Sequence, residues 1–185
     1  PTMDLRVAES RAALSERKSS EKRALPDYFY GVGSFPYNDG YAFATRLYKS
    51  GGWEAVNGAY ARPPRSTEQV LHPEKYAADE APLAVTLPDL AAKLGAGWAE
   101  RERDVFGELG LRLILAEGAG PVAAANGAKG WGGDRYALLQ NTSGAYAIVI
   151  RTRWDSADDA QEFMDTYRVA NADRPGFVEQ AGSLT

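Results

Sequence analysis

The 185-residue chain contains no cysteine, which excludes disulfide bonds and thiolate-ligated zinc. It has one histidine, His72, and no HExxH sequence, so no catalytic zinc site and no cofactor are expected within it. Basic residues are outnumbered: 21 Lys and Arg against 25 Asp and Glu give a net charge of −4 and a pI near 5.1. Nucleic acid is not expected as a partner, because phosphate binding needs clustered basic side chains.

Long apolar runs are also missing. No stretch approaches the roughly 20 apolar residues of a membrane-spanning helix, and no signal peptide or Walker loop is visible. The pair Gly31 and Gly33 does not continue into a dinucleotide loop, because Pro36 stands where a third glycine is needed. The composition is 44% apolar and 25% charged, which is ordinary for a globular protein. We therefore expect a single domain over residues 1–185.

Most of the specific signal lies in residues 36–76. Apolar side chains at helical spacing predict a buried helix from about Gly40 to Gly51-Gly52, with the stripe Tyr41, Ala44, Thr45 and Tyr48 widened by Phe43 and Leu47. The same spacing from Trp53 to Tyr60 predicts a second helix, packed beside the first as a hairpin.

A proline-rich segment follows this predicted hairpin. Ser66 and Gln69 have the spacing of a helix capping box, so a short helix is expected there. His72 is expected to end that helix because the residue before a proline is disfavoured in helical geometry, and Pro73 suits the start of another turn.

Residues before this region are less regular. Residues 3–23 predict a polar, alanine-rich helix whose mixed-charge run at 16–23 forms a solvated face. An aromatic segment, expected to be irregular and to lie over the hairpin, follows with Tyr28, Phe29, Tyr30, Phe35 and Tyr37.

After Tyr76, alternation over residues 83–87 predicts a short strand, and Pro88 predicts a helix that ends at Gly95. Asp104 is expected to cap the next helix. Two interpretations of Glu108 on that helix stay open: a buried carboxylate, which must then be paired, or a position in water at the rim. Another turn or two of helix is expected at residues 121–128.

From residue 130 the period changes to that of strands, with a turn at Asn141-Thr142-Ser143-Gly144 between DRYALLQ and AYAIVIRTRW. Asp155 or Ser156 then caps a helix that buries Ala160, Phe163, Met164 and Tyr167. The predicted fold is α+β: a helical part over about 1–128, an antiparallel β-hairpin with a covering helix over about 130–170, and a tail over 171–185.

Several long segments of the sequence resemble one known family. YAF…LYKSGGWEAVNGAY, PPRSTEQVLHPEKY, WGGDRYALL and TRWDSADDAQEF are similar, in this order, to the C-terminal part of bacterial zinc-metallopeptidase-like proteins of the HExxH, gluzincin-like type. The resemblance covers roughly residues 27–168. It implies that the catalytic part, with its zinc ligands, precedes Pro1, which is either a natural processing site or an engineered boundary.

The resemblance also singles out candidate cleft residues. Glu68, Gln69, His72 and Tyr76 occupy the family's STEQ…HPEKY segment, which implies a place beside the peptidase cleft. Histidine and tyrosine suit hydrogen bonding to the oxyanion of a tetrahedral intermediate. The alternative is structural: Gln69 serves the helix cap, and His72 binds carbonyl groups at a helix end.

Two classes of function follow. The chain is either the C-terminal lobe of a metallopeptidase-like protein, inactive alone and supporting or lining its cleft, or a non-catalytic interaction module derived from that fold. In the second case the aromatic segment from Tyr28 to Tyr37 is the expected partner surface. The resemblance favours a secreted or cell-envelope location, and the composition also suits the cytoplasm.

Overall fold

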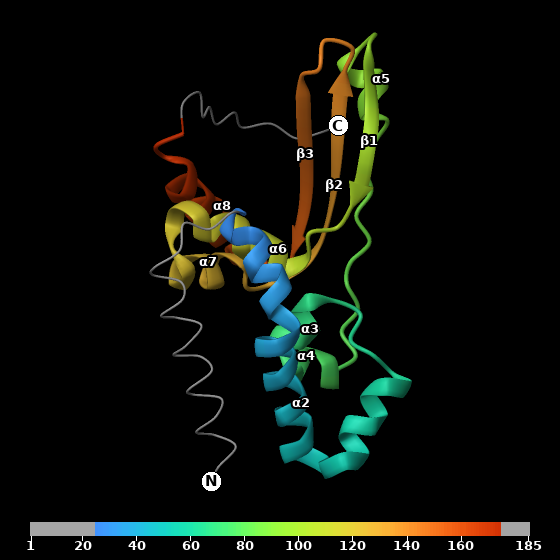
Figure 1. The fold of residues 1–185 in the computed structure, drawn as a ribbon, viewed down its shortest axis with the longest axis vertical. Coiled ribbons are helices and arrows are strands. Elements are labelled where there is room, and N and C mark those ends of the chain that lie inside the picture. The colour runs from blue at the N-terminus through green and yellow to red at the C-terminus, as the bar shows by residue number, and fades with distance from the viewer. Residues whose placement is uncertain (1–24, 175–185) are drawn as a thin grey trace.

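The computed structural model describes residues 25–174, shown as a ribbon in Figure 1. The predictions for residues 3–23, and for the tail beyond residue 174, lie outside this range. The predicted α+β class is confirmed. The elements in chain order are α2 (Asp27–Ala61), α3 (Thr67–Leu71), α4 (Pro73–Ala77), α5 (Leu90–Leu94), β1 (Trp98–Asp104), α6 (Gly107–Ala119), α7 (Pro121–Ala128), β2 (Trp131–Asn141), β3 (Tyr146–Trp154) and α8 (Ala157–Asn171).

Helix α2 begins earlier than the sequence indicated, so the expectation of an irregular aromatic segment was wrong. The helix includes Pro36 and the glycines before it. Gly31 is explained by close approach to α6, because a Cβ there would lie 2.3 Å from a methyl carbon of Leu113. Tertiary packing thus favours helix where glycine and proline suggested a loop.

The predicted break at Gly51-Gly52 is confirmed. Gly52 has φ +62°, a left-handed conformation that suits glycine, and the chain changes direction sharply there (Figure 1). The expected burial is confirmed only in part: Phe43 is buried and Ala44, Thr45 and Leu47 are half-buried, whereas Tyr41 and Tyr48 are exposed. The helix therefore turns the Phe43 and Leu47 side of the predicted stripe inward.

The two short helices after α2 form as predicted. The Ser66 hydroxyl accepts a hydrogen bond from the Gln69 backbone N–H at 3.2 Å. His72 separates α3 from α4, and Pro73 is the first residue of α4. The chain therefore makes a sharp corner at His72.

The sheet has three antiparallel strands in the order β1-β2-β3. The hairpin of β2 and β3 with its Asn141 turn is confirmed, since the Asn141 N–H binds the Ala145 carbonyl at 3.0 Å. Strand β1 was missed because its sequence, WAERERD, has no apolar alternation and its side chains are mostly exposed. The strand predicted over residues 83–87 was wrong, because this segment has no regular secondary structure, although Leu83 N–H binds the Gly132 carbonyl.

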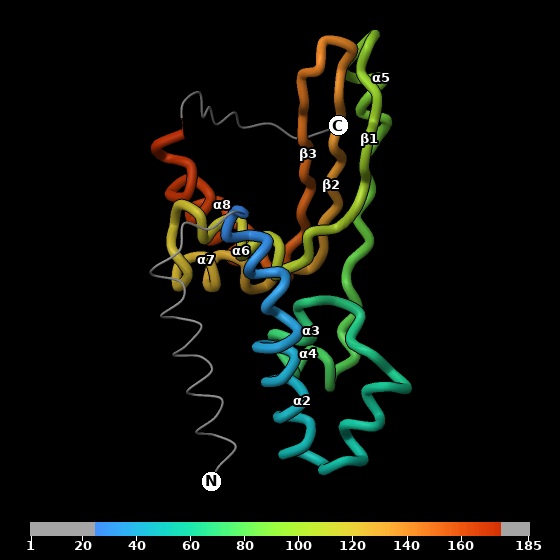
Figure 2. Tube along the Cα trace, viewed as in Figure 1, coloured from blue at the N-terminus to red at the C-terminus, as the bar shows by residue number. Residues whose placement is uncertain are grey.

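Two hydrophobic clusters stabilise the described residues. One covers a single face of the sheet and joins Leu87 and Leu90 to Ala137 and Leu139. The opposite face leaves Tyr146, Ile148 and Ile150 exposed. The other cluster lies between α6, α7 and α8, which gather at the foot of the sheet in Figure 2, and comprises Leu115, Ala124 and Ala128 with Phe163 and Tyr167 packed on them.

The start of α6 is capped from a distance, which corrects the expectation for Asp104. Asp104 ends β1 and binds only the adjacent Val105 N–H. The buried Asp134 of β2 accepts the Phe106 and Gly107 N–H groups, each at 2.8 Å, and the indole N–H of Trp131 at 2.9 Å. The α8 cap is as predicted, with the Ser156 hydroxyl accepting from Asp159 N–H.

Candidate functional site

The four candidate residues of the STEQ…HPEKY segment lie on α3, α4 and their junction. They meet side chains from three other parts of the chain. We call this group the polar corner: Glu68, Gln69, His72, Lys75, Tyr76, Glu80, Glu108 and Asp155.

Gln69 and Tyr76 are used by the fold. Gln69 is 1% exposed; its side-chain oxygen accepts the Arg65 N–H, and its amide donates to the Glu80 carbonyl, both at 2.7 Å. The Tyr76 hydroxyl donates to the Arg62 carbonyl at 2.8 Å, and its ring meets that of Phe43 edge-on at 5.1 Å. Gln69 thus joins segments within the corner, and Tyr76 joins the corner to α2.

Lys75 sits among three carboxylates. Its ammonium group donates to Glu68 Oε1 at 2.7 Å, to Glu80 Oε1 at 2.7 Å and to Asp155 Oδ2 at 2.5 Å. Burial, opposed by Lys75, raises the pKa of Glu68 to about 7. The pKa of Lys75 is raised by its bonds to the carboxylates, which outweigh the opposing effect of burial. The cluster joins α4 to the loop between β3 and α8.

His72 pairs with the buried Glu108 of α6. Its Nε2 lies 2.8 Å from Glu108 Oε1, and this bond, which outweighs the opposing effect of burial, raises the pKa of His72. Glu108 is 2% exposed, so the buried interpretation is confirmed and the rim interpretation was wrong. Its Oε2 atom is buried and has no hydrogen-bond partner among the described residues. A negative charge at this place in the first turn of α6 is favoured by the helix dipole.

The chemistry available to the corner is limited by these internal bonds. Oxygens of Glu68, Glu80 and Asp155 lie close enough together to hold a metal ion, but the Lys75 ammonium already binds all three. Of the candidate donors to an oxyanion, those of Tyr76 and Gln69 are bound to carbonyl groups, and His72 Nε2 is bound to Glu108. The geometry is therefore that of an ionic junction in which Glu68 and Glu108 are buried while Glu80 and Asp155 are exposed.

Sequence reasoning found half of this group. The segment resemblance brought together Glu68, Gln69, His72 and Tyr76, and the structure places them in one cluster. The other four members were not proposed as site residues: Lys75, Glu80, Glu108 and Asp155. Lys75 is only seven residues from Glu68, although the break at His72 separates their helices, whereas nothing local connects Asp155 to a residue 80 positions earlier.

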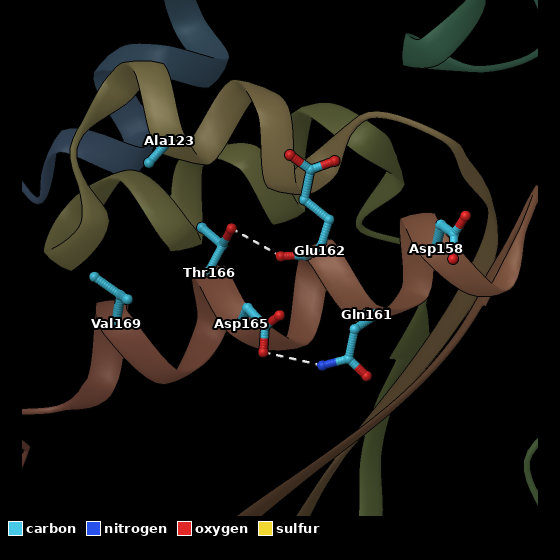
Figure 3. A pocket seen from close by; sticks show the side chains of 7 residues that line it. All are labelled: Ala123, Asp158, Gln161, Glu162, Asp165, Thr166 and Val169. Carbon is cyan, nitrogen blue, oxygen red and sulfur yellow. Dashed lines mark hydrogen bonds between the residues drawn. The ribbon is translucent and has the colours of Figure 1, made fainter.

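Two surface hollows lie outside the innermost part of the corner. One, of about 470 Å³, borders Lys75, Glu80 and Asp155 and continues over Trp154. The other, of about 460 Å³, lies between α7 and α8 and is shown in Figure 3. In the view of Figure 3, the Thr166 hydroxyl donates to the Glu162 carbonyl and the Gln161 amide to Asp165; the acids Asp158, Glu162 and Asp165 border this second hollow.

The fold and site define an α+β domain with a partly buried ionic junction. A family model described as a domain of unknown function (DUF8575) matches residues 92–182. This range contains Glu108 and Asp155 but begins after α3 and α4. No curated protein and no solved structure matches the chain. No helix among residues 25–174 is long and apolar enough to cross a membrane.

Proposed function

We propose that this chain is a supporting, non-catalytic lobe of a secreted or envelope-associated zinc-metallopeptidase-like protein. The sequence resemblance suggests the class, and the metal-binding part is proposed to lie on other sequence. The lobe supports that part through α2 and does not supply groups that react. The following observations support this proposal.

The observation that carries it is a row of tyrosines along the outer side of α2. Tyr37, Tyr41 and Tyr48 are separated by four and seven residues, which places them on one helical face over roughly 16 Å. Their exposed fractions are 81%, 38% and 49%. Exposed tyrosines in a row are typical of protein contacts, because each offers a large ring and a polar tip.

The closed polar corner supports the same conclusion. Gln69 and Tyr76 donate to carbonyl groups of the chain and His72 Nε2 binds Glu108, so we assign these three residues to holding α2, α3, α4 and α6 together. The partner surface expected from the sequence, the aromatic segment from Tyr28 to Tyr37, is exposed only in part. Phe29, Tyr30 and Tyr37 are exposed, whereas Tyr28 and Phe35 are half-buried.

The test begins with the coding sequence upstream of Pro1 and with the complete protein expressed from it. We expect an HExxH helix there and stoichiometric zinc in the purified protein. In the complete protein, His72→Ala should lower the melting temperature while kcat of the folded enzyme stays within about twofold, since the residue is proposed not to touch the reacting atoms. A loss of kcat with the fold intact would contradict the supporting role.

The proposed contact face, the row of Tyr37, Tyr41 and Tyr48 on α2, is tested by a binding measurement. The upstream part and this chain are expressed separately, and their affinity is measured by calorimetry. Replacing Tyr37, Tyr41 and Tyr48 together with alanine should weaken binding at least about tenfold, the effect expected for aromatic contacts. Tyr60→Ala is the matched control, because Tyr60 is 85% exposed but follows the break in α2. Equal loss in both variants would contradict the assignment.

The alternative function is an interaction module without any peptidase. The same exposed tyrosine row favours it, because the row does not depend on a metal-bearing part. An upstream sequence that lacks HExxH, with a purified protein free of zinc, would support this alternative and overturn the metallopeptidase-like class.

A further inference from the structure

The structure points to a proton-operated latch: we infer that His72 and Glu108 hold the corner of α3 and α4 against α6 when His72 is protonated, and loosen that contact when it is neutral. The consequence is control over α2, which rests on the same corner. This inference is independent of the peptidase-related proposal above.

The geometry of the latch is a single bridge across an element junction. His72 lies between α3 and α4, and Glu108 lies in the first turn of α6, 36 residues later. The bridge is 2.8 Å long, and its carboxylate is nearly inaccessible to water while the histidine side chain is 21% exposed. The His72 side chain can therefore exchange its proton with solvent while Glu108 stays buried.

The balance of charge around the buried carboxylates depends on the protonation of His72. Glu68 and Glu108 are both buried carboxylates, and Lys75 supplies one positive charge to this region. With His72 protonated, the two carboxylates face two cations. With His72 neutral, the buried Glu108 loses its cationic partner while its other oxygen has no partner among the described residues, a costly arrangement for a carboxylate in a low-dielectric interior.

Other charges near the bridge act in the same direction. His72 is faced by Glu108 from α6, by Glu74 from α4 with its carboxylate 3.6 Å from Nδ1, and by Glu68 from α3. Within residues 25–174, α2 makes no ion pair with His72 or Glu108. The raised pKa of His72 means that this bridge contributes stability below about pH 6.5, and that the contribution is lost as pH rises through the folded pKa.

Helix α2 is linked to the latch through Tyr76. The ring of Tyr76 on α4 contacts Phe43, the buried residue of α2. Opening of the corner thus removes the surface against which the middle of α2 packs. The pH response at α3 and α6 therefore reaches the packing surface of α2, the helix with the exposed tyrosine row.

The test is hydrogen exchange of the 185-residue chain at pH 5.5 and pH 8.5, corrected for intrinsic rates. The first turn of α6 and helix α3 should lose protection by at least about threefold at the higher pH, while β2 and β3 keep theirs. Glu108→Gln removes the buried charge and should abolish this difference. Glu74→Gln is the matched control: Glu74 also faces His72 but is 71% exposed, so the difference should persist.

Three outcomes would overturn the latch. The first is a pH-dependent change in hydrogen exchange in Glu108→Gln that equals that of the wild type. The second is a loss of protection at the higher pH that is equal in α3, α6 and the sheet. The third is independent of any variant's folding: His72 is the chain's one histidine, so its proton NMR signal titrates alone. A pKa at or below 6.5 in the wild-type chain would contradict the latch, and a raised value supports it.

Discussion

Asp134 shows how one buried side chain sets the position of a helix. Two backbone N–H groups and an indole N–H converge on its carboxylate. These bonds lower its pKa, yet burial outweighs them and the net pKa is raised. The carboxylate is therefore held in place by its donors and not by a neighbouring salt bridge.

Replacing Asp134 with asparagine should destabilise the protein by about 2 kcal/mol, because an amide NH₂ would then face backbone donors. Asp104→Asn is the control, since Asp104 is exposed and binds one adjacent N–H; its effect should stay within about 0.5 kcal/mol. Urea denaturation followed by circular dichroism measures both. Equal effects for the two variants would show that Asp134 does not cap α6.

At the scale of elements, the crossing of α6 and α8 depends on a glycine. A Cβ at Gly118 would lie 2.1 Å from the Ala170 carbonyl oxygen, which belongs to the backbone of α8 and cannot move aside cheaply. The contact brings the two helices together over the cluster of Leu115 and its neighbours.

Gly118→Ala should therefore lower the free energy of unfolding by about 1–3 kcal/mol, despite the gain of helix propensity. Gly33→Ala in α2 is the matched control, because no atom lies within 4 Å of its Cβ position; it should stabilise by about 0.5–1 kcal/mol. Thermal unfolding of both variants measures the contrast. A stabilised Gly118→Ala would contradict the close helix crossing.

Elements with local signals were predictable, and those set by distant residues were not. The Ser66 cap and the Asn141 turn have their signals within a few residues, and both formed, although the Gln69 side chain accepts from the Arg65 N–H in place of the Ser66 N–H of a full capping box. The cap of α6 comes from Asp134, 28 residues away, and strand β1 is specified by pairing with β2. At the polar corner the candidate residues could be named from the segment, but the partner Asp155 could not.

At the scale of the whole molecule, two hydrophobic clusters are joined by an ionic one. The sheet has its own apolar face, and α6, α7 and α8 share a second cluster. The polar corner connects α3 and α4 to α6 through Glu108 and to the β3–α8 loop through Asp155. The central claim is that these charged residues hold the lobe together through their mutual bonds, including those of Lys75 to Glu80 and Asp155, which border the surface hollow.

The most direct measurement of that claim is a double-mutant cycle of Glu68→Gln and Lys75→Met by urea denaturation at pH 8.5. Glu68 is ionised there because its folded pKa is about 7. Lys75→Met alone should cost about 3 kcal/mol by leaving a buried carboxylate unpaired, and the coupling energy should be about 2 kcal/mol.

The same cycle at pH 5.5 supplies the control. The pKa of Glu68 is raised on folding, so its protonated form stabilises the fold below the ordinary value near 4.5, and this contribution is lost as pH rises to about 7. The coupling to Lys75 should therefore shrink at pH 5.5. A coupling within about 0.5 kcal/mol of zero at pH 8.5 would contradict the account, because it would mean that Lys75 is solvated and Glu68 is free to face a ligand.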